Sequence, residues 1–286
     1  MVEVECERVG VLSNPIWCEQ NLDDPRKTGE GWHSLISRHR GVDLAKAFCP
    51  DEQPFPNGTR TIWVVGYNDQ ETAEQPEFGP DHQRHYEICP PSTLSTGEPV
   101  EIPPHGDRVE LSCELAAVIG RRLVERVGPN EVIGLLEGFT IMVGMRDYGL
   151  YAELDAPTDR ETMFSGYFGR WVDGFNATCP NLVPAGDVDI DDLEMRLSLD
   201  GIGQAVTRTS DYVFNFGRVI SFLSNQITLL PGDVVSLGSA GERLIISPEV
   251  KLPVGSKIFA SIESLGEFAV PLNDRRGPHL PLHEVV

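Results

Sequence analysis

The chain is short of basic residues. Its 286 residues include 23 Lys or Arg against 44 Asp or Glu, which gives a formal charge of -21 and a pI near 4.6. Nucleic-acid binding needs clustered Lys and Arg to neutralise phosphates, and anionic membrane surfaces attract polybasic segments. We therefore expect no nucleic-acid or membrane partner.

Long apolar runs and paired cysteines are also lacking. No stretch approaches the roughly 18 to 20 apolar residues of a membrane-spanning helix. The first residues, MVEVECERVG, lack the basic start and apolar run of a signal peptide, so a cytoplasmic location is the default expectation. Because no CxxC pair occurs, neither a zinc site nor a disulfide framework is indicated, and most thiols are interpreted as buried: Cys6, Cys18, Cys49, Cys89, Cys113 and Cys179.

Turn-forming residues divide the chain into many short segments. The 28 glycines and 22 prolines separate runs of alternating Val, Ile and Leu, which predicts a strand-rich fold with short connections. Residues 1–60 mix short apolar pieces with Pro and Gly and predict a small N-terminal subdomain, with helical spacing over 31–48. Residues 61–286 would then form the main domain.

Several elements of that domain can be predicted individually. Apolar runs predict buried strands at 61–67, 114–120 and 138–144, and strict alternation over 193–201 ends in an Asp-Gly hairpin signal. A short helix is expected after the turn at 128–130. A longer helix is expected after a cap at Ser210 or Asp211, followed by a strand and two closing strands around 265–266. The polar, acidic segment 68–85 is either a lid or a solvated connection.

Six segments together resemble the fumarylacetoacetate hydrolase superfamily over roughly 61–272. They are VVGYNDQETAEQ, PPSTLSTGEPVEIP, ELAAVIG, GFTIMVGMRD, the block from TSDYVFNF to LGSAG, and SIESLGEFAVPL. The resemblance implies an α+β fold with a mixed β-roll core and a homodimer. It also implies a small-molecule substrate and chemistry on 2-oxo acids and 1,3-dicarbonyl compounds, namely carbon–carbon hydrolysis, decarboxylation, hydration or isomerisation.

The metal site that the resemblance implies is incomplete in this chain. Family enzymes hold Mg²⁺ or Mn²⁺ with an E-x-E pair before L-A-x-x-I-G and an Asp in the next strand. Here Glu114 takes the second position of the pair, but the first is Ser112, and the Asp position falls on Gly144 or Met142. Glu110 is four residues from Glu114, which is about 13 Å along a regular strand at roughly 3.3 Å per residue, so the two carboxylates are too far apart to share an ion without a bulge. One carboxylate is a poor Mg²⁺ site, so we predict no metal and no other cofactor.

Other family groups are exchanged as well. The His and Glu that activate water in the lid motif correspond to Thr72 and Gln75, which cannot take a proton at neutral pH. The lysine of K-P-P-S is Cys89. The lysine of K-x-x-D is Arg170, with Asp173 retained, and the threonine of G-T-P-x-G is Ser239.

The resemblance would gather seven residues in one pocket. Arg170 could bind a carboxylate or enolate oxygen, or form a structural pair with Asp173. Glu114 could act as a general acid or base, or be a structural carboxylate, and Ser239 is expected to donate or accept hydrogen bonds. The remaining residues, expected to bind substrate, are Tyr67, Arg146, Asp147 and Asp173, with a structural role for Arg146 and Asp147 as the alternative.

A relocated dyad in the predicted lid is a further possibility. His82 and His85 lie beside acidic residues there, and imidazole titrates near neutral pH. The alternative is that both are solvated loop histidines.

Three functions follow from these residues. The first is a metal-independent enzyme acting on an enol, 1,3-dicarbonyl or 2-oxo acid by isomerisation, elimination, decarboxylation or cyclisation. The second is a Mg²⁺-dependent hydrolase or decarboxylase whose ligands are other carboxylates, such as Asp107, Glu110 or Asp147. The third is a non-catalytic binding or assembly protein on the same fold.

Overall fold

This computed structural model describes residues 2–6, 10–14, 55–56, 58–59, 61–75, 85–104, 106–120, 124–148 and 168–277. In the predicted N-terminal subdomain, β1 (Val2–Cys6) pairs antiparallel with β2 (Gly10–Asn14). The helix predicted at 31–48 lies outside the described residues. The division of the chain at residue 60 therefore stays a prediction.

A mixed sheet of eight strands, counted within the described residues, carries the long central pair of the fold. Its order places β7 (Val109–Ile119) between β12 (Val234–Ser236) and β8 (Leu136–Asp147). β7 and β8 are antiparallel, whereas β12 is parallel to β3. The remaining strands are β3 (Ile62–Gly66), β4 (His85–Cys89), β9 (Asn176–Thr178), β5 (Leu94–Ser95) and β13 (Leu244–Ile246), the last of which pairs with β7.

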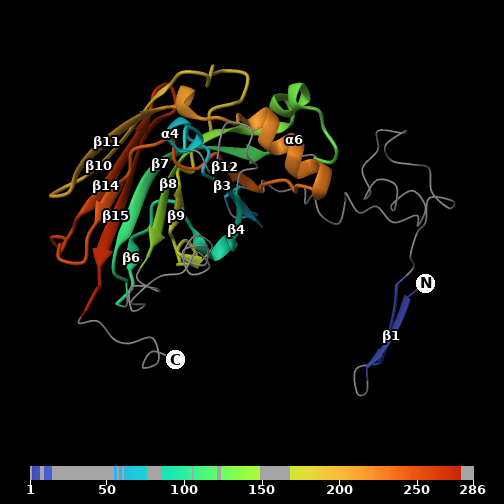
Figure 1. The fold of residues 1–286 in the computed structure, drawn as a ribbon, viewed down its shortest axis with the longest axis horizontal. Coiled ribbons are helices and arrows are strands. Elements are labelled where there is room, and N and C mark those ends of the chain that lie inside the picture. Colours follow the sequence, from blue (N-terminus) through green and yellow to red (C-terminus); the bar gives the residue numbers. More distant parts are fainter. Residues whose placement is uncertain are drawn as a thin grey trace.

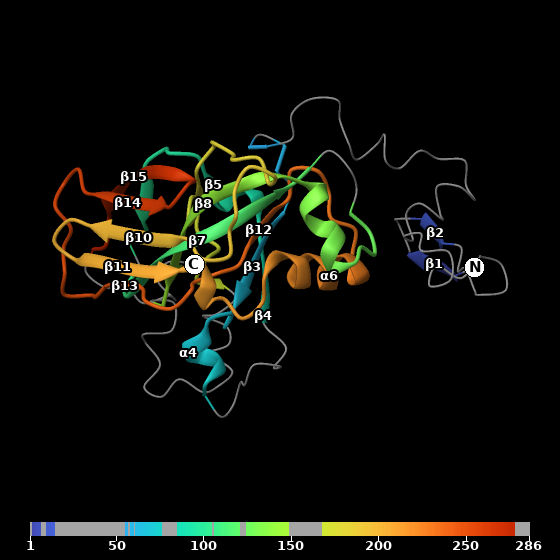
Figure 2. The ribbon, with the colours of Figure 1, turned by 90° about the horizontal axis from the view of Figure 1, so that it is seen from above.

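A second sheet of five described strands packs against this pair. Its order is β11 (Gly203–Arg208), β10 (Glu194–Leu199), β14 (Lys257–Ile262), β15 (Gly266–Asp274) and β6 (Val100–Ile102). Figures 1 and 2 show its orange and red strands beside β7 and β8. Buried side chains from both sheets, such as Leu115 and Leu197, meet in one hydrophobic core. The strand-rich α+β fold with a mixed β-roll is thus confirmed.

Short helices cap this arrangement. α6 (Phe216–Gln226) begins after Asn215, whose side chain accepts a hydrogen bond from the backbone N–H of Arg218. The predicted helix is therefore correct, but its predicted cap is wrong, because Ser210 and Asp211 lie in the 3₁₀ turn η4 (Thr209–Asp211). The short helix predicted after the turn at 128–130 is present as a 3₁₀ helix, η2 (Pro129–Leu135). A further 3₁₀ turn is η1 (Pro91–Thr93), and α4 (Gln70–Ala73) forms one turn in the predicted lid.

None of the helices in the described ranges is long and apolar enough to cross a membrane. The predicted strands are confirmed, although β7 and β8 extend beyond their predicted bounds. The predicted hairpin is β10 with β11, and the closing pair is β14 with β15.

Alternation along β7 separates the core from a polar face. Leu111, Cys113 and Leu115 belong to the hydrophobic core. Because successive side chains point to opposite faces of a strand, the even-numbered residues from 110 to 114 point away from that core. In the register with β8, Ser112 lies opposite Gly144, and Glu110 lies opposite Arg146. This polar face is the floor of a cavity.

Candidate functional site

A cavity of about 350 Å³ lies over the polar face of β7 and β8. β3, β4 and the chain after β12 complete its walls. The lining residues are Val64, Val65, Gly66, Tyr67, Asp69, Glu87, Glu110, Ser112, Glu114, Gly144, Met145, Arg146, Tyr148, Arg170, Gly238, Ser239 and Arg243.

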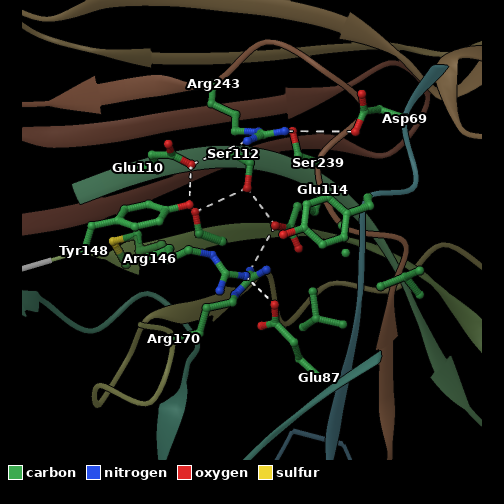
Figure 3. Close-up of a pocket in the computed structure, with 17 residues that line it drawn as sticks. Asp69, Glu87, Glu110, Ser112, Glu114, Arg146, Tyr148, Arg170, Ser239 and Arg243 are labelled. Carbon is green, nitrogen blue, oxygen red and sulfur yellow. Dashed lines mark hydrogen bonds and ion pairs between the residues drawn. The ribbon is translucent and has the colours of Figure 1, made fainter. Parts of the chain in front are cut away.

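A buried ion pair stands at the centre of this site (Figure 3). Glu114 and Arg170 are 1% and 4% exposed, and Arg170 Nη2 lies 2.9 Å from Glu114 Oε1. The hydroxyl of Ser112 donates to the same oxygen at 2.6 Å, and the hydroxyl of Ser236, on β12, donates to Oε2 at 2.6 Å. Both carboxylate oxygens of Glu114 are therefore held by donors.

The guanidinium of Arg170 is fixed from a second side. Its Nε donates to Asn176 Oδ1 at 3.1 Å, and Asn176 Nδ2 donates to Thr93 Oγ1 at 2.8 Å. Burial alone would lower the pKa of Arg170, but the charges of Glu114 and Glu87 more than offset burial, so the pKa lies above its usual value. Nη1 donates no hydrogen bond to any described residue. Arg170 lines the cavity, so it brings a permanent charge there and keeps one nitrogen without an acceptor among the described residues.

Gly144 makes room for this guanidinium. A Cβ atom at residue 144 would lie 2.0 Å from Arg170 Nη2 and 2.2 Å from Glu114 Oε1. No real side chain tolerates such contacts, so the ion pair occupies the space that a side chain at 144 would need. The ion pair between Arg170 and Glu114 therefore requires glycine at residue 144.

These residues do not fit the family's three-carboxylate metal site. A carboxylate remains only at Glu114, with a hydroxyl at Ser112 and a guanidinium in the space at Gly144. Across the described ranges, no group of three or more His, Cys, Asp or Glu side chains could hold a metal ion. The alternative ligands are dispersed, because Asp147 does not line the cavity and Glu110 is bonded to Tyr148.

Two further arginines in the cavity also face carboxylates. Arg146 Nη2 lies 2.5 Å from Glu87 Oε1, and the Glu87 side chain is buried. Arg243 lies nearer the solvent, with its side chain 39% exposed. Its Nη1 is 3.6 Å from Glu110 Oε2, its Nη2 is 4.0 Å from Asp69 Oδ2, and its Nε donates to Ser239 Oγ at 3.2 Å.

Tyr148 and Asp69 complete the polar wall. The hydroxyl of Tyr148 donates to Glu110 Oε2 at 3.2 Å, and burial together with the charge of Glu110 raises the pKa of Tyr148 to about 12. Tyr148 is therefore a neutral donor at physiological pH. Asp69 caps α4, accepting from the backbone N–H and the hydroxyl of Thr72, both at 2.8 Å. The residue at the family's His position is thus engaged in capping.

The structure brings together five of the seven predicted site residues. Tyr67, Glu114, Arg146, Arg170 and Ser239 line the cavity, and Tyr67 is half exposed with a positive φ of 58°.

The other two predicted residues lie elsewhere. Asp147 is buried and accepts from the backbone N–H of Asp107, while Asp173 is exposed. Arg170 forms its ion pair with Glu114 and not with Asp173. His82 and the side chain of His85 lie outside the described part of the chain, so their proposed dyad stays a prediction.

Among the ionisable residues that line the cavity, four have no role in the prediction: Asp69, Glu87, Tyr148 and Arg243. Tyr148 could have been found by continuing the period of two from Gly144 and Arg146 along β8. Glu87 could have been found in the same way, because it precedes Cys89 by two residues on β4 and so lies on the same face of that strand. No local pattern indicates Asp69 or Arg243, which reach the cavity from loops.

Comparison with known proteins identifies the family. The sequence pattern of the fumarylacetoacetate (FAA) hydrolase C-terminal family matches residues 61–273. An uncharacterized protein of Pyrococcus horikoshii is 29% identical over 216 residues, which cover 74% of this chain and 89% of that protein.

Two further relatives have names that denote enzymes. The mitochondrial oxaloacetate tautomerase of Arabidopsis thaliana is 30% identical over 189 residues, covering 65% of this chain and 78% of that protein. The homoprotocatechuate catabolism bifunctional isomerase/decarboxylase of Escherichia coli is 24% identical over 252 residues, covering 85% of this chain and 53% of that protein.

The fold is shared with solved structures. The 5-carboxymethyl-2-hydroxymuconate delta-isomerase from Mycobacterium smegmatis superimposes with a TM-score of 0.63 at 22% identity, covering 77% of this chain and 80% of that one. With a matched pattern over most of its length and the corresponding fold, this chain belongs to the fumarylacetoacetate hydrolase family.

Proposed function

We propose that this protein is a metal-independent enzyme that stabilises the enol or enolate form of a 1,3-dicarbonyl compound or 2-oxo acid. The reaction we favour is isomerisation by proton transfer, with elimination, decarboxylation and cyclisation in the same class. One observation carries the proposal: the guanidinium of Arg170 occupies the space at Gly144 and pairs with Glu114.

Arg170 is the group that stabilises negative charge. A guanidinium stays charged at any physiological pH, and Arg170 is pre-positioned by Glu114 and Asn176 in a buried site. Fixed charges in a water-poor site stabilise developing charge more than water does, because they need no reorganisation. An enolate oxygen placed at Nη1 would receive this stabilisation.

Glu114 and Glu87 take different roles in this proposal. Glu114 already accepts from Ser112, Ser236 and Arg170, so we assign it the positioning of Arg170. Besides Glu114, the buried carboxylates of the cavity are Glu87 and Asp69, and of these two it is the charge of Glu87 that acts on Arg170. We assign Glu87 the proton transfer. Glu87 takes a proton from the carbon beside the carbonyl group held by Arg170 and returns it to another atom of the same enolate, so isomerisation is balanced.

The remaining cavity residues bind the substrate. Tyr67, Arg146 and Ser239 line the walls around the central pair. The predicted substrate-binding residues Asp147 and Asp173 do not line the cavity and receive no role.

Hydrolysis is less well supported than isomerisation. Thr72 and Gln75 stand where family hydrolases have the His and Glu that activate water, and Thr72 is engaged by Asp69. The names of the Arabidopsis tautomerase and the Escherichia coli isomerase/decarboxylase also favour proton-transfer chemistry on enolisable acids. The homodimer and the cytoplasmic location stay predictions.

The test follows the disappearance of an enol by its ultraviolet absorbance, using protein treated with EDTA and assayed with and without Mg²⁺ or Mn²⁺. We expect turnover to be unaffected by EDTA. Because Arg170→Ala would leave Glu114 buried without its cation, a second variant, Arg170→Met with Glu114→Gln, removes both charges at similar volume. We expect this folded double variant to lose turnover. Arg196→Ala, at an exposed ion pair on β10, is the matched control.

Two results would contradict the proposal. The first is strict dependence on Mg²⁺ or Mn²⁺. The second is wild-type turnover by the folded double variant.

A further inference from the structure

The charges of the side chains that line the cavity nearly cancel one another. Among the described residues that line it, Arg146, Arg170 and Arg243 are basic, and one more carboxylate than guanidinium is present: Asp69, Glu87, Glu110 and Glu114. The formal charge of the lining is therefore -1 when all these groups are ionised. Every one of the three guanidinium groups lies within 4.0 Å of a carboxylate.

This balance opposes the binding of an anionic substrate. Nη1 of Arg170 is the nitrogen that the enolate oxygen needs, so a substrate carboxylate would have to bind elsewhere in the cavity. There it would have to separate a guanidinium from its internal partner, which would leave that partner without a cation. Alternatively, it would stand unpaired in a cavity that already carries excess negative charge. Both outcomes are unfavourable, because a buried charge without a partner loses its hydration without compensation.

An uncharged substrate meets no such obstacle. Its carbonyl group can accept a hydrogen bond from Nη1 of Arg170 without disturbing the pair with Glu114. Negative charge then appears only as the enolate forms, at the one oxygen that the guanidinium faces. Val64, Val65 and Met145 add apolar surface for the rest of the molecule.

We infer that the substrate is an uncharged, enolisable 1,3-dicarbonyl compound, such as a β-diketone or β-keto ester, and not a free 2-oxo carboxylate. This inference rests on the proposed function and narrows its substrate class. It separates this chain from relatives whose names denote carboxylates, such as the oxaloacetate tautomerase and the carboxymethyl-hydroxymuconate isomerase.

A matched pair of probes tests the inference: 2,4-dioxopentanoate and its methyl ester, which differ by one negative charge. Binding is measured by calorimetry and turnover by enol absorbance, both with EDTA-treated full-length protein. An interaction with a charged group is worth about 1.5–3 kcal/mol, so we expect the ester to be preferred by roughly tenfold to a hundredfold.

A charge variant sharpens the comparison. Glu110→Gln removes the carboxylate nearest to Arg243, 3.6 Å away, and should tighten binding of the free acid so that the preference for the ester narrows. Glu101→Gln is the matched control, because it removes one negative charge from an exposed pair with Arg275 outside the cavity. The control should keep the wild-type preference.

The outcomes distinguish this inference from the function on which it rests. Equal binding, or preference for the free acid, with EDTA-resistant turnover overturns the inference and leaves the proposed function standing. If neither probe binds or reacts, both are overturned. Preference for the ester that narrows in Glu110→Gln but not in Glu101→Gln supports the inference.

Discussion

Gly144→Ala tests the central packing of the site directly. The new methyl group would lie 2.0 Å from Arg170 Nη2, 2.2 Å from Glu114 Oε1 and 2.7 Å from Glu114 Cδ. Neither side chain is a free end that can simply move, since Arg170 is bonded to Asn176 and Glu114 to Ser112. We therefore expect the ion pair to separate.

The size of the effect follows from the burial of the pair. Separating a buried ion pair costs about 3–5 kcal/mol, because an uncompensated charge stays in the interior. Alanine returns about 0.4–1 kcal/mol by reducing the entropy of the unfolded chain. The free energy of unfolding should fall by about 2–4 kcal/mol. In a protein of this size each kcal/mol lowers Tm by about 2–4 °C, so Tm should fall by roughly 5–15 °C.

Denaturant unfolding followed by circular dichroism measures this change, with enol turnover measured in parallel. Gly134→Ala is the matched control, because a Cβ atom there meets nothing within 4 Å. It should change stability by no more than about 0.5 kcal/mol. If Gly144→Ala were as stable and as active as Gly134→Ala, the packing of Arg170 against the space at residue 144 would be refuted.

Two other predictions concern the cation and the pH dependence. A triple variant with Ser112→Glu, Gly144→Asp and Arg170→Lys restores the two carboxylates and the lysine that the family has at these positions. This variant should bind Mg²⁺ with a Kd of about 1 mM or lower by calorimetry. Failure to bind would argue against the interpretation that Arg170 occupies the position of the cation. Burial and the charge of Glu110 raise the pKa of Tyr148 to about 12, so the folded protein keeps a proton that the unfolded chain releases near pH 10. Stability should therefore fall as pH rises from about 10 to about 12, and Tyr148→Phe should make the fall shallower in denaturant titrations; an unchanged slope would contradict this.

The strands could be predicted where a run of apolar residues is uninterrupted. Residues 114–119 are a run of buried side chains, whereas Val109–Cys113 of the same strand includes Glu110 and Ser112 on the cavity side. These polar residues interrupt the apolar pattern, so the start of β7 was predicted too late. The helix cap was misplaced for a related reason. Ser210, Asp211 and Asn215 are all good caps, so residue type alone does not rank them, and the structure caps α6 with Asn215.

The site could be predicted as a set of exchanged residues but not as a set of contacts. Substitution of lysine by arginine at residue 170 was visible in the sequence, and Asp173, three residues away, offered a local partner. The structure pairs Arg170 with Glu114, which is 56 residues away, because both are buried while Asp173 is exposed. Partners from distant elements, such as Arg243 with Asp69, have no local signal.

Two departures from the family's ligand set, at Ser112 and Gly144, and the exchange of the family's lysine for Arg170 are best understood as one physical change. Gly144 supplies the space, Arg170 supplies the charge, and Ser112 supplies a donor where a second carboxylate would have been. Reversing any one of them alone is unfavourable. A side chain at 144 collides with the guanidinium, a carboxylate at 112 adds a second anion beside Glu114, and loss of Arg170 leaves Glu114 without a cation. Residues in contact couple in this way, so their separate substitutions should not add. That coupling explains why all three positions differ together while Glu114, which a cation of either kind would need, is retained.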